Sequence, residues 1–365
     1  MESNDAAPGE DAHRISSSRL SSYPIFVAAL LDVKKAAARA NQQAGALSQE
    51  KRERISVACE SLASRAEMFA VDPYSGGGGI LINASVNRLI ANESGLELTD
   101  VNLSQSTADV VATALRIALI RVGEPLQQNL RASVGLMAKN QKKFEHTPST
   151  ARTCLQDAMP VALGTLFEGY AHVLERRADS LDLSLRGLHK INLGGTVIGS
   201  SEGAAAGYSD QILAEIKNGS GLALEWRKSL FDAAQNADDL GELNHALSLL
   251  SEVSIKIAKD LRLLHSGPEH GFGEIRLPLI IQGSSFFKSK NNPTIPETFL
   301  QACFVALGRC RTAGLTLEHA ELNLNVFEFA GGFALYEALE VLSNAFRGLN
   351  ENCLQSISAA KGDSL

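Results

Sequence analysis

Apolar side chains recur every three or four residues through most of the chain, which is the pattern of helices with one buried face. The clearest series has spacings of 4, 3, 4, 4, 4 and 3 residues and consists of Leu115, Leu119, Val122, Leu126, Leu130, Val134 and Met137. Such a series predicts one helix of many turns. Pro125 lies inside it, and its missing N–H predicts a kink or a junction between two helices.

Four more long apolar stripes follow. They predict helices over residues 155–188, 222–264, 296–310 and 322–353. Shorter helices are predicted over residues 23–41, 50–68 and 83–92, with Ser48 as a candidate N-cap of the second. Five long helices joined by polar loops are typical of a bundle, so the pattern predicts an all-α fold.

The same pattern divides the chain into four parts. A polar and acidic tail over residues 1–20 is expected to be disordered. Residues 21–105 are expected to form a small N-terminal helical domain, and residues 106–353 the central five-helix bundle. Residues 354–365 are expected to form a short tail.

Composition narrows the classes of function. The 365 residues carry a formal net charge of −7, which argues against sequence-independent binding of nucleic acid through a basic surface. No apolar run reaches the length of a membrane span, and the N-terminus lacks the features of a signal peptide. The five cysteines are scattered and odd in number, so they predict reduced thiols and a cytoplasmic protein.

The chain shows no pattern of a metal or phosphate site. No spacing of its histidines and cysteines matches a set of metal ligands, so neither a metal nor another cofactor is expected. The glycine run over residues 76–79 lacks the Gly-Lys-Ser/Thr ending of a phosphate-binding loop, which leaves a flexible loop as its prediction.

The most informative polar stretch is residues 283–293, Gly-Ser-Ser-Phe-Phe-Lys-Ser-Lys-Asn-Asn-Pro, with Glu297 shortly after it. Its Gly, Ser and Asn content predicts a loop, and Pro293 is expected to open the next helix. A loop with hydroxyl, ammonium and amide groups that leads into a helix N-terminus suits a carboxylate ligand. Taken alone, the stretch leaves a solvated surface loop as an equal alternative.

Five motifs, in the same order along the chain, resemble those of one superfamily. They are residues 104–109 (Ser-Gln-Ser-Thr-Ala-Asp), 152–158 (Arg-Thr-Cys-Leu-Gln-Asp-Ala), 193–199 (Leu-Gly-Gly-Thr-Val-Ile-Gly), 283–293, and 323–328 (Asn-Leu-Asn-Val-Phe-Glu). Together they resemble the aspartase/fumarase superfamily over about residues 24 to 353. The resemblance implies an all-helical fold, with a small N-terminal domain and a long five-helix bundle. The superfamily's third, C-terminal domain is expected to be absent, because this sequence ends about where the bundle ends.

The resemblance also implies an activity. Superfamily members convert a substituted succinate into fumarate by anti-elimination, and they are tetramers in which each active site takes segments from three subunits. The expected partners are therefore a small dicarboxylate and three further copies of this chain in a homotetramer. By motif position, Ser284 would be the base that removes the proton, and Glu297 would orient water or a proton donor.

Six further residues would bind the substrate. By motif position, these are Ser106, Thr107, Thr153, Ser285, Lys290 and Asn292. In the superfamily, the counterparts of Ser285, Ser106 and Thr107 contact the carboxylate next to the proton that leaves. The counterparts of Lys290, Asn292 and Thr153 hold the other carboxylate.

The departures from the superfamily's motifs gather on the leaving-group side. Ile80 and Ile82 stand where the superfamily has threonines, Ala108 where it has asparagine, and Cys154 where it has histidine. An ammonium leaving group needs several hydrogen-bond acceptors once it is desolvated, and these apolar side chains offer none. Cys154 either replaces the histidine as an acid or base or is a packing residue. In the signature loop, Phe287 replaces a methionine and Lys288 a proline.

These observations favour a lyase whose leaving group is not plain ammonia. One alternative is a non-catalytic or hetero-oligomeric homologue that binds a dicarboxylate. A second alternative is a fumarate hydratase or an aspartate ammonia-lyase with an altered site.

Overall fold

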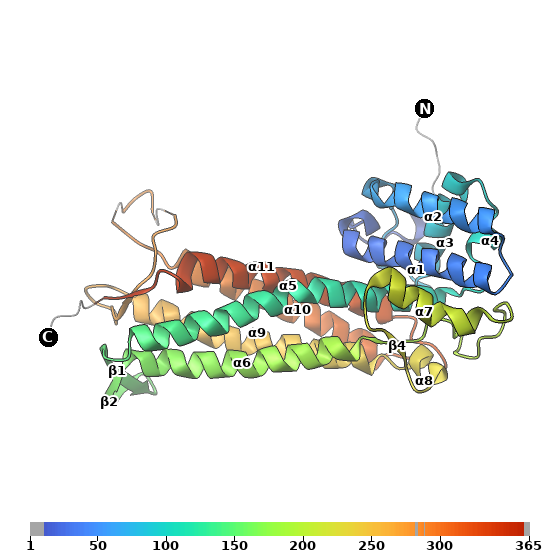
Figure 1. Ribbon diagram of the computed structural model, residues 1–365. Helices are drawn as coiled ribbons and strands as arrows, with labels where there is room; N and C mark the ends of the chain where they lie inside the picture. Colours follow the sequence, from blue (N-terminus) through green and yellow to red (C-terminus); the bar gives the residue numbers. More distant parts are fainter. Residues whose placement is uncertain (1–10, 282–283, 288, 361–365) are drawn as a thin grey trace. The chain divides into compact units, whose positions relative to one another are not determined.

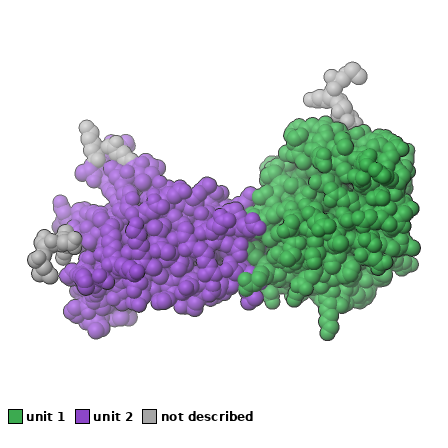
Figure 2. All heavy atoms as spheres, in the orientation of Figure 1, with its two compact units in different colours: residues 1–122, 185–242, 311–336 green, residues 123–184, 243–310, 337–365 purple. Residues whose placement is uncertain are grey.

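The computed structural model describes residues 11–281, 284–287 and 289–360, and these form two compact units (Figure 2). Unit 1 comprises residues up to 122, 185–242 and 311–336, and unit 2 comprises residues 123–184, 243–310 and 337 onwards. The described residues contain eleven α-helices and only short strands, so the predicted all-α fold is confirmed. Within the described ranges, no helix is long and apolar enough to cross a membrane.

Unit 1 contains the short helices of the chain (Figure 1). These are α1 (Pro24–Gln43), α2 (Gln49–Ala63), α3 (Ile80–Ser94), α4 (Leu98–Val101), α7 (Tyr208–Ser220) and α8 (Leu230–Gln235). A short parallel pair joins β3 (Lys190–Ile191) to β4 (Glu225–Trp226), and 3₁₀ turns lie at Asp11–His13, Leu20–Ser22 and Ala66–Met68.

Local signals in the sequence explain the ends of these helices. The Ser48 hydroxyl accepts a hydrogen bond from the Lys51 backbone N–H at 3.2 Å, as expected of an N-cap. Gly95 ends α3 in the left-handed conformation, with a φ of 64°. The core of unit 1 includes an edge-to-face contact between Phe26 and Phe333, with ring centroids 5.0 Å apart.

Unit 2 contains the larger part of five long helices and is itself a five-helix bundle. The helices are α5 (Thr107–Lys143), α6 (Leu163–Gly187), α9 (Asp238–His265), α10 (Thr294–Glu318) and α11 (Glu328–Leu349), and a π-helical turn over Asn350–Leu354 follows α11. Leu126, Leu130 and Met137 are fully buried, which confirms the apolar stripe on α5. Phe299 of α10 packs on Phe346 of α11 with ring centroids 4.9 Å apart.

Two antiparallel strand pairs complete unit 2. The first is a hairpin of β1 (Pro148–Thr153) and β2 (Gln156–Ala162), with Thr153 opposite Gln156. The second joins β5 (Ile275–Arg276) to β6 (Ser358–Ala359).

Several predicted boundaries were wrong. The helix predicted from residue 155 begins at Leu163, because the β1–β2 hairpin occupies the residues before it. Residues 222–229 and 322–327 are not helical, whereas α7 was not predicted. α5 continues through Pro125, so the junction between two helices that was one expected outcome there does not occur.

The predicted division into parts also differs from the structure. Segments 106–122, 185–242 and 311–336, predicted as part of the bundle, belong to unit 1. In the predicted tail, Asp72 accepts hydrogen bonds from the backbone N–H groups of Ile15 and Ser16, and Leu20 is fully buried. The folded part therefore begins before residue 21. Residues 1–10 and 361–365 of the two predicted tails lie outside the described residues.

Candidate active site

The predicted site residues are divided between the two units. Unit 1 holds Ile80, Ile82, Ser106, Thr107 and Ala108, whereas unit 2 holds Thr153, Cys154, Ser284, Ser285, Lys290, Asn292 and Glu297. Two residues of the predicted signature loop, Gly283 and Lys288, lie outside the described residues.

Ser284 sits at the start of a tight turn in unit 2. Its Oγ accepts hydrogen bonds from the backbone N–H groups of Phe286, at 3.1 Å, and Phe287, at 2.9 Å. Two N–H dipoles directed at one hydroxyl oxygen stabilise negative charge on that oxygen. The turn therefore supplies part of the support that a serine alkoxide requires. Ser285, the next residue, is exposed.

The same loop borders a cavity of about 650 Å³ in unit 2. Three predicted residues line it: Lys290, Asn292 and Glu297. Arg262 and Arg276 also line it, so the lining contains three basic side chains and the carboxylate of Glu297. Arg262 pairs with that carboxylate, with 3.3 Å between its Nη2 and Oε1 of Glu297. The excess of positive charge favours an anionic ligand.

His265, at the end of α9, holds the base of this loop in place. Its ring is nearly buried, with an exposed fraction of 8%. Nδ1 lies 3.3 Å from the backbone nitrogen of Leu277 and 3.4 Å from the carbonyl oxygen of Ile275. Nε2 lies 3.1 Å from the carbonyl oxygen of Asn291. His265 thus connects the end of α9 to the residue between Lys290 and Asn292.

Thr153 and Cys154 lie at the tip of the β1–β2 hairpin. Cys154 and Leu155 have φ values of 54° and 60°, as in two-residue hairpin turns that usually need Asn or Gly. Arg152 anchors the strand below them through Glu274 at 2.5 Å. The Cys154 side chain is exposed in the described chain. Neither Thr153 nor Cys154 is among the described residues that line the Lys290 cavity.

In unit 1, a capping box fixes the start of α5. Asp109 accepts a hydrogen bond from the Ser106 N–H at 3.0 Å, while the Ser106 hydroxyl accepts one from the Ala108 N–H at 3.3 Å. Asp109 also accepts from the N–H groups of Gly194 and Thr196. Burial raises the pKa of Asp109 to about 6, although these three N–H groups oppose the shift.

Of the three residues predicted to face the leaving group, only one lies on the surface. Ile80 is 61% exposed, whereas Ile82 is fully buried. Residues two positions apart in an α-helix are separated by about 200° around its axis, so the side chains of Ile80 and Ile82 lie on opposite faces of α3. The prediction that Ile80 and Ile82 share one pocket is therefore corrected. Ala108 is 5% exposed, and Thr107 accepts a hydrogen bond from the Asn83 amide at 3.1 Å.

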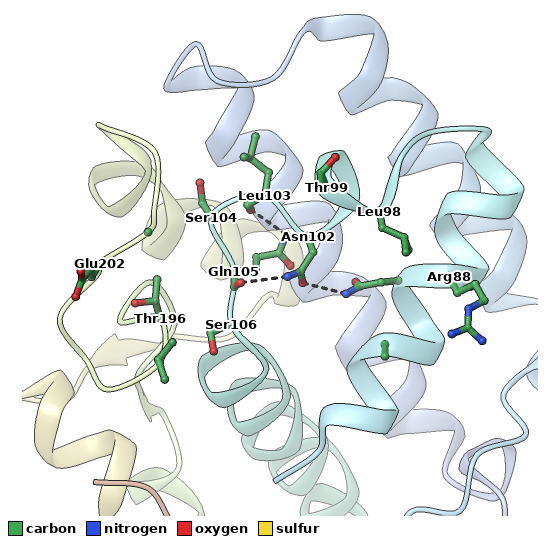
Figure 3. Close-up of a pocket in the computed structure, with 14 residues that line it drawn as sticks. Arg88, Leu98, Thr99, Asn102, Leu103, Ser104, Gln105, Ser106, Thr196 and Glu202 are labelled. Atoms are coloured by element: carbon green, nitrogen blue, oxygen red, sulfur yellow. Dashed lines mark hydrogen bonds between the residues drawn. The ribbon is translucent and has the colours of Figure 1, made fainter. Parts of the chain in front are cut away.

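A second cavity, of about 680 Å³, lies in unit 1 and includes Ser106 in its lining (Figure 3). Arg88, Asn87 and Glu202 also line it, and none of them was predicted as a site residue. Arg262, Arg276 and His265 in unit 2 were missed as well. Arg88 and its neighbour Asn87 had a readable signal, because Arg88 follows Ile80 by two helical turns. Glu202 is far from them in the sequence, and Arg262, His265 and Arg276 lie outside the five motifs.

Comparison with known proteins identifies the family. A family model described as a lyase matches residues 11–308. Aspartate ammonia-lyases from Helicobacter pylori and Bacillus subtilis are 34% and 35% identical to this chain. The alignments cover 94% and 92% of this chain and 77% and 74% of those proteins. The chain belongs to the aspartase/fumarase superfamily.

Solved structures of superfamily members are similar to this chain in fold. A fumarate lyase:delta crystallin from Brucella melitensis is 34% identical, with a TM-score of 0.93 over 96% of this chain and 80% of that one. A class II fumarase from Schistosoma mansoni is 22% identical with a TM-score of 0.88 over 92% of this chain and 77% of that one, which shows a common fold. The predicted superfamily and the prediction of a lyase are thereby confirmed.

This superfamily member has a buried lysine behind the unit 1 cavity. Lys34 is 1% exposed, and its ammonium group donates to the side-chain oxygens of Asn102 at 3.2 Å and Gln105 at 3.0 Å. Burial lowers the pKa of Lys34 to about 7, against the opposing attraction of Asp109. No group of three or more His, Cys, Asp or Glu in the described chain is placed to hold a metal ion.

The depressed pKa of Lys34 predicts a pH-dependent stability. Unfolding restores an ordinary lysine that binds a proton up to about pH 10, so the unfolded state binds more protons above pH 7. The free energy of unfolding should therefore rise with pH above about 7, by up to about 1.4 kcal/mol per pH unit. Urea unfolding at slightly alkaline pH values should show this rise in the wild type and lose it in Lys34→Met. Parallel pH profiles for the two proteins would contradict the assignment.

Proposed function

We propose that this superfamily member is a lyase that eliminates fumarate from a substituted succinate whose leaving group is not plain ammonia. The observation that carries the proposal is a contrast between the two sets of site residues. Around Ser284 and Lys290, hydrogen-bond donors and cations suit a dicarboxylate. Where the leaving group is expected, Ile80 presents an exposed apolar side chain and Ala108 offers no side-chain acceptor.

The proposed reaction begins at Ser284. Its oxygen, supported by the N–H groups of Phe286 and Phe287, takes the proton from the carbon beside one carboxylate. The electron pair of that C–H bond first passes to the neighbouring carboxylate, which gives a dianionic intermediate. It then forms the C=C bond of fumarate as the bond to the substituent breaks, and the electron pair of that second bond leaves with the substituent, which takes up a proton.

The substrate carboxylates are assigned to the residues that the motifs point to. Lys290, Asn292 and Thr153 would hold one carboxylate, and Ser285, Ser106 and Thr107 the other. Negative charge on the carboxylate increases in the intermediate, so its contacts with Lys and Ser side chains become stronger there. Contacts that are stronger in the transition state than in the ground state accelerate the reaction.

Two residues are assigned to proton transfer. Glu297, held by Arg262, would orient water or a proton donor. Cys154, with its exposed side chain, would supply the proton to the departing group where other members use histidine.

We also propose that the complete site forms in a homotetramer, with segments from three subunits. Ser285, Thr153 and Cys154 are all exposed in the described chain, so a neighbouring copy could complete their surroundings. The free cysteines fit a reducing compartment, and we propose the cytoplasm.

Supplying purified protein with fumarate and a panel of nucleophiles tests the proposal. The panel contains ammonia, water, primary amines of increasing size and amino acids, and mass spectrometry identifies the adducts. We expect an adduct with at least one organic amine and little or no aspartate or malate. Absence of every adduct would overturn the proposal and favour a non-catalytic dicarboxylate-binding homologue.

The similarity to aspartate ammonia-lyases supports a second candidate, an aspartate ammonia-lyase with an altered site. In that case ammonia would be the best nucleophile in the same panel, and aspartate the main product.

A further inference from the structure

Arg88 gives the unit 1 cavity a cation with no described partner. Its side chain is half-buried and lines the cavity, and no residue of the described chain forms an ion pair with it. Ile80, Ala84 and Arg88 follow one another at intervals of one turn, so they lie on one broad face of α3. Ala84 also lines the cavity. This face therefore runs from an apolar side chain to a guanidinium over about 12 Å.

Asn87 is the neighbour of Arg88 in the wall of the cavity. It is 6% exposed, and its amide nitrogen donates to Oδ1 of Asn102 at 3.0 Å. Its own Oδ1 has no hydrogen-bond partner in the described chain. This oxygen is buried, so Asn87 shapes the wall of the cavity beside Arg88.

The other charge in the lining is placed away from Arg88. Glu202 is exposed and lies on the opposite side of the cavity from Arg88 (Figure 3). A ligand with an anionic end is attracted to the Arg88 side and repelled from the Glu202 side. Ser106, a predicted substrate contact, lies in the same lining.

We infer that this cavity receives the far end of the leaving group, and that the leaving group is an amine with a carboxylate at this end. Arg88 pairs with that carboxylate, and Ala84 contacts the carbon chain. Arg88 is thus a residue that determines specificity. The inference rests on the proposed function and names its substrate class: N-(carboxyalkyl) derivatives of aspartate.

The chemistry balances without any further reactant. In the reverse direction, the amine nitrogen forms a bond to one alkene carbon of fumarate, and the neighbouring carbon gains a proton. In the forward direction, that proton leaves, the C–N bond breaks, and the amine departs with its electron pair.

The test compares pairs of amines of equal length in the reverse direction. Each pair consists of an ω-amino carboxylate, such as β-alanine or a longer homologue, and the alkylamine that lacks the carboxylate. For the wild type, we expect kcat/KM for the amino carboxylate to exceed that for the alkylamine by about tenfold or more, as for a close charge pair. Arg88→Gln should remove this preference while changing kcat/KM for the alkylamine by less than about twofold.

A charge reversal and a matched control complete the test. Arg88→Glu should turn the preference towards diamines of the same length. Arg311→Gln, which removes an exposed guanidinium from α10, should leave the wild-type preference unchanged. An equal loss of activity towards both amines in Arg88→Gln would overturn this inference and leave the proposed function standing. If the wild type forms no adduct with any amine, both are overturned.

Discussion

Replacement of Ser284 by alanine is expected to abolish turnover while the fold remains intact. The alanine has no oxygen to take the proton, and a positioned base contributes about a hundredfold to ten-thousandfold to a rate. We therefore expect kcat to fall by about a thousandfold or more with the best substrate. The backbone N–H groups of Phe286 and Phe287, which now donate to Ser284, lie on exposed residues and can turn to water.

A control variant separates the loss of the base from a general loss of a hydroxyl. Thr298→Ala removes an exposed hydroxyl from α10 that donates a hydrogen bond to the Thr294 carbonyl within the same helix. It should keep wild-type kcat. Both variants should unfold at the wild-type temperature in a thermal scan. A Ser284→Ala enzyme that kept its turnover would remove Ser284 from the role of base.

The largest expected effect on stability comes from Asp239→Ala in unit 1. Asp239 accepts two hydrogen bonds from the guanidinium of Arg116, at 2.7 and 3.0 Å, and Arg116 is 4% exposed. Glu328 is the second acid beside Arg116, at 3.5 Å. Burial raises the pKa of Glu328 against the pull of Arg116, so this carboxyl only partly replaces Asp239. Breaking a buried pair by removing one partner costs about 3–5 kcal/mol, and we expect a loss of that size.

The neighbouring aspartate is a matched control. The Asp238 side chain is 70% exposed and pairs with Arg227 at 2.7 Å. Arg227 keeps the Asp232 carboxylate and the Asn236 carbonyl as acceptors when Asp238 is removed, and a pair with one exposed partner contributes about 1 kcal/mol. Asp238→Ala should therefore cost far less than Asp239→Ala. Denaturant unfolding of the two variants measures both values. Equal losses of unfolding free energy in the two variants would show that the buried triad of Arg116, Asp239 and Glu328 stabilises the fold no more than the Asp238 pair does.

The long helices were predictable because their sequence signal is strong and local. The stripe from Leu115 to Met137 needs only the period of a helix, and the structure buries nearly all of its members. The hairpin was not predictable in this way. Its turn is Cys154-Leu155, and neither residue is typical of a turn with positive φ. α7 was missed because its buried apolar residues are few, chiefly Ile212 and Ile216.

The candidate site was predictable only where residues are close in the sequence. Lys290, Asn292 and Glu297 belong to one loop and one helix start, and they do line one cavity. Arg262 lies on α9 and Arg276 on β5, and both reach this cavity because the chain folds back after α9. Ile82 was wrongly placed in one pocket with Ile80 for a different reason. Matching residue types to a motif does not show which face of α3 each side chain lies on, whereas the period of the helix does.

The identity of the leaving group can be measured as the ratio of kcat/KM for fumarate release from an N-substituted aspartate to that from aspartate, on one preparation of the protein. We expect a ratio of about ten or more, because Ile80 and Ala108 give a desolvated ammonium no side-chain acceptor. A ratio below one, with aspartate the better substrate, would contradict the account.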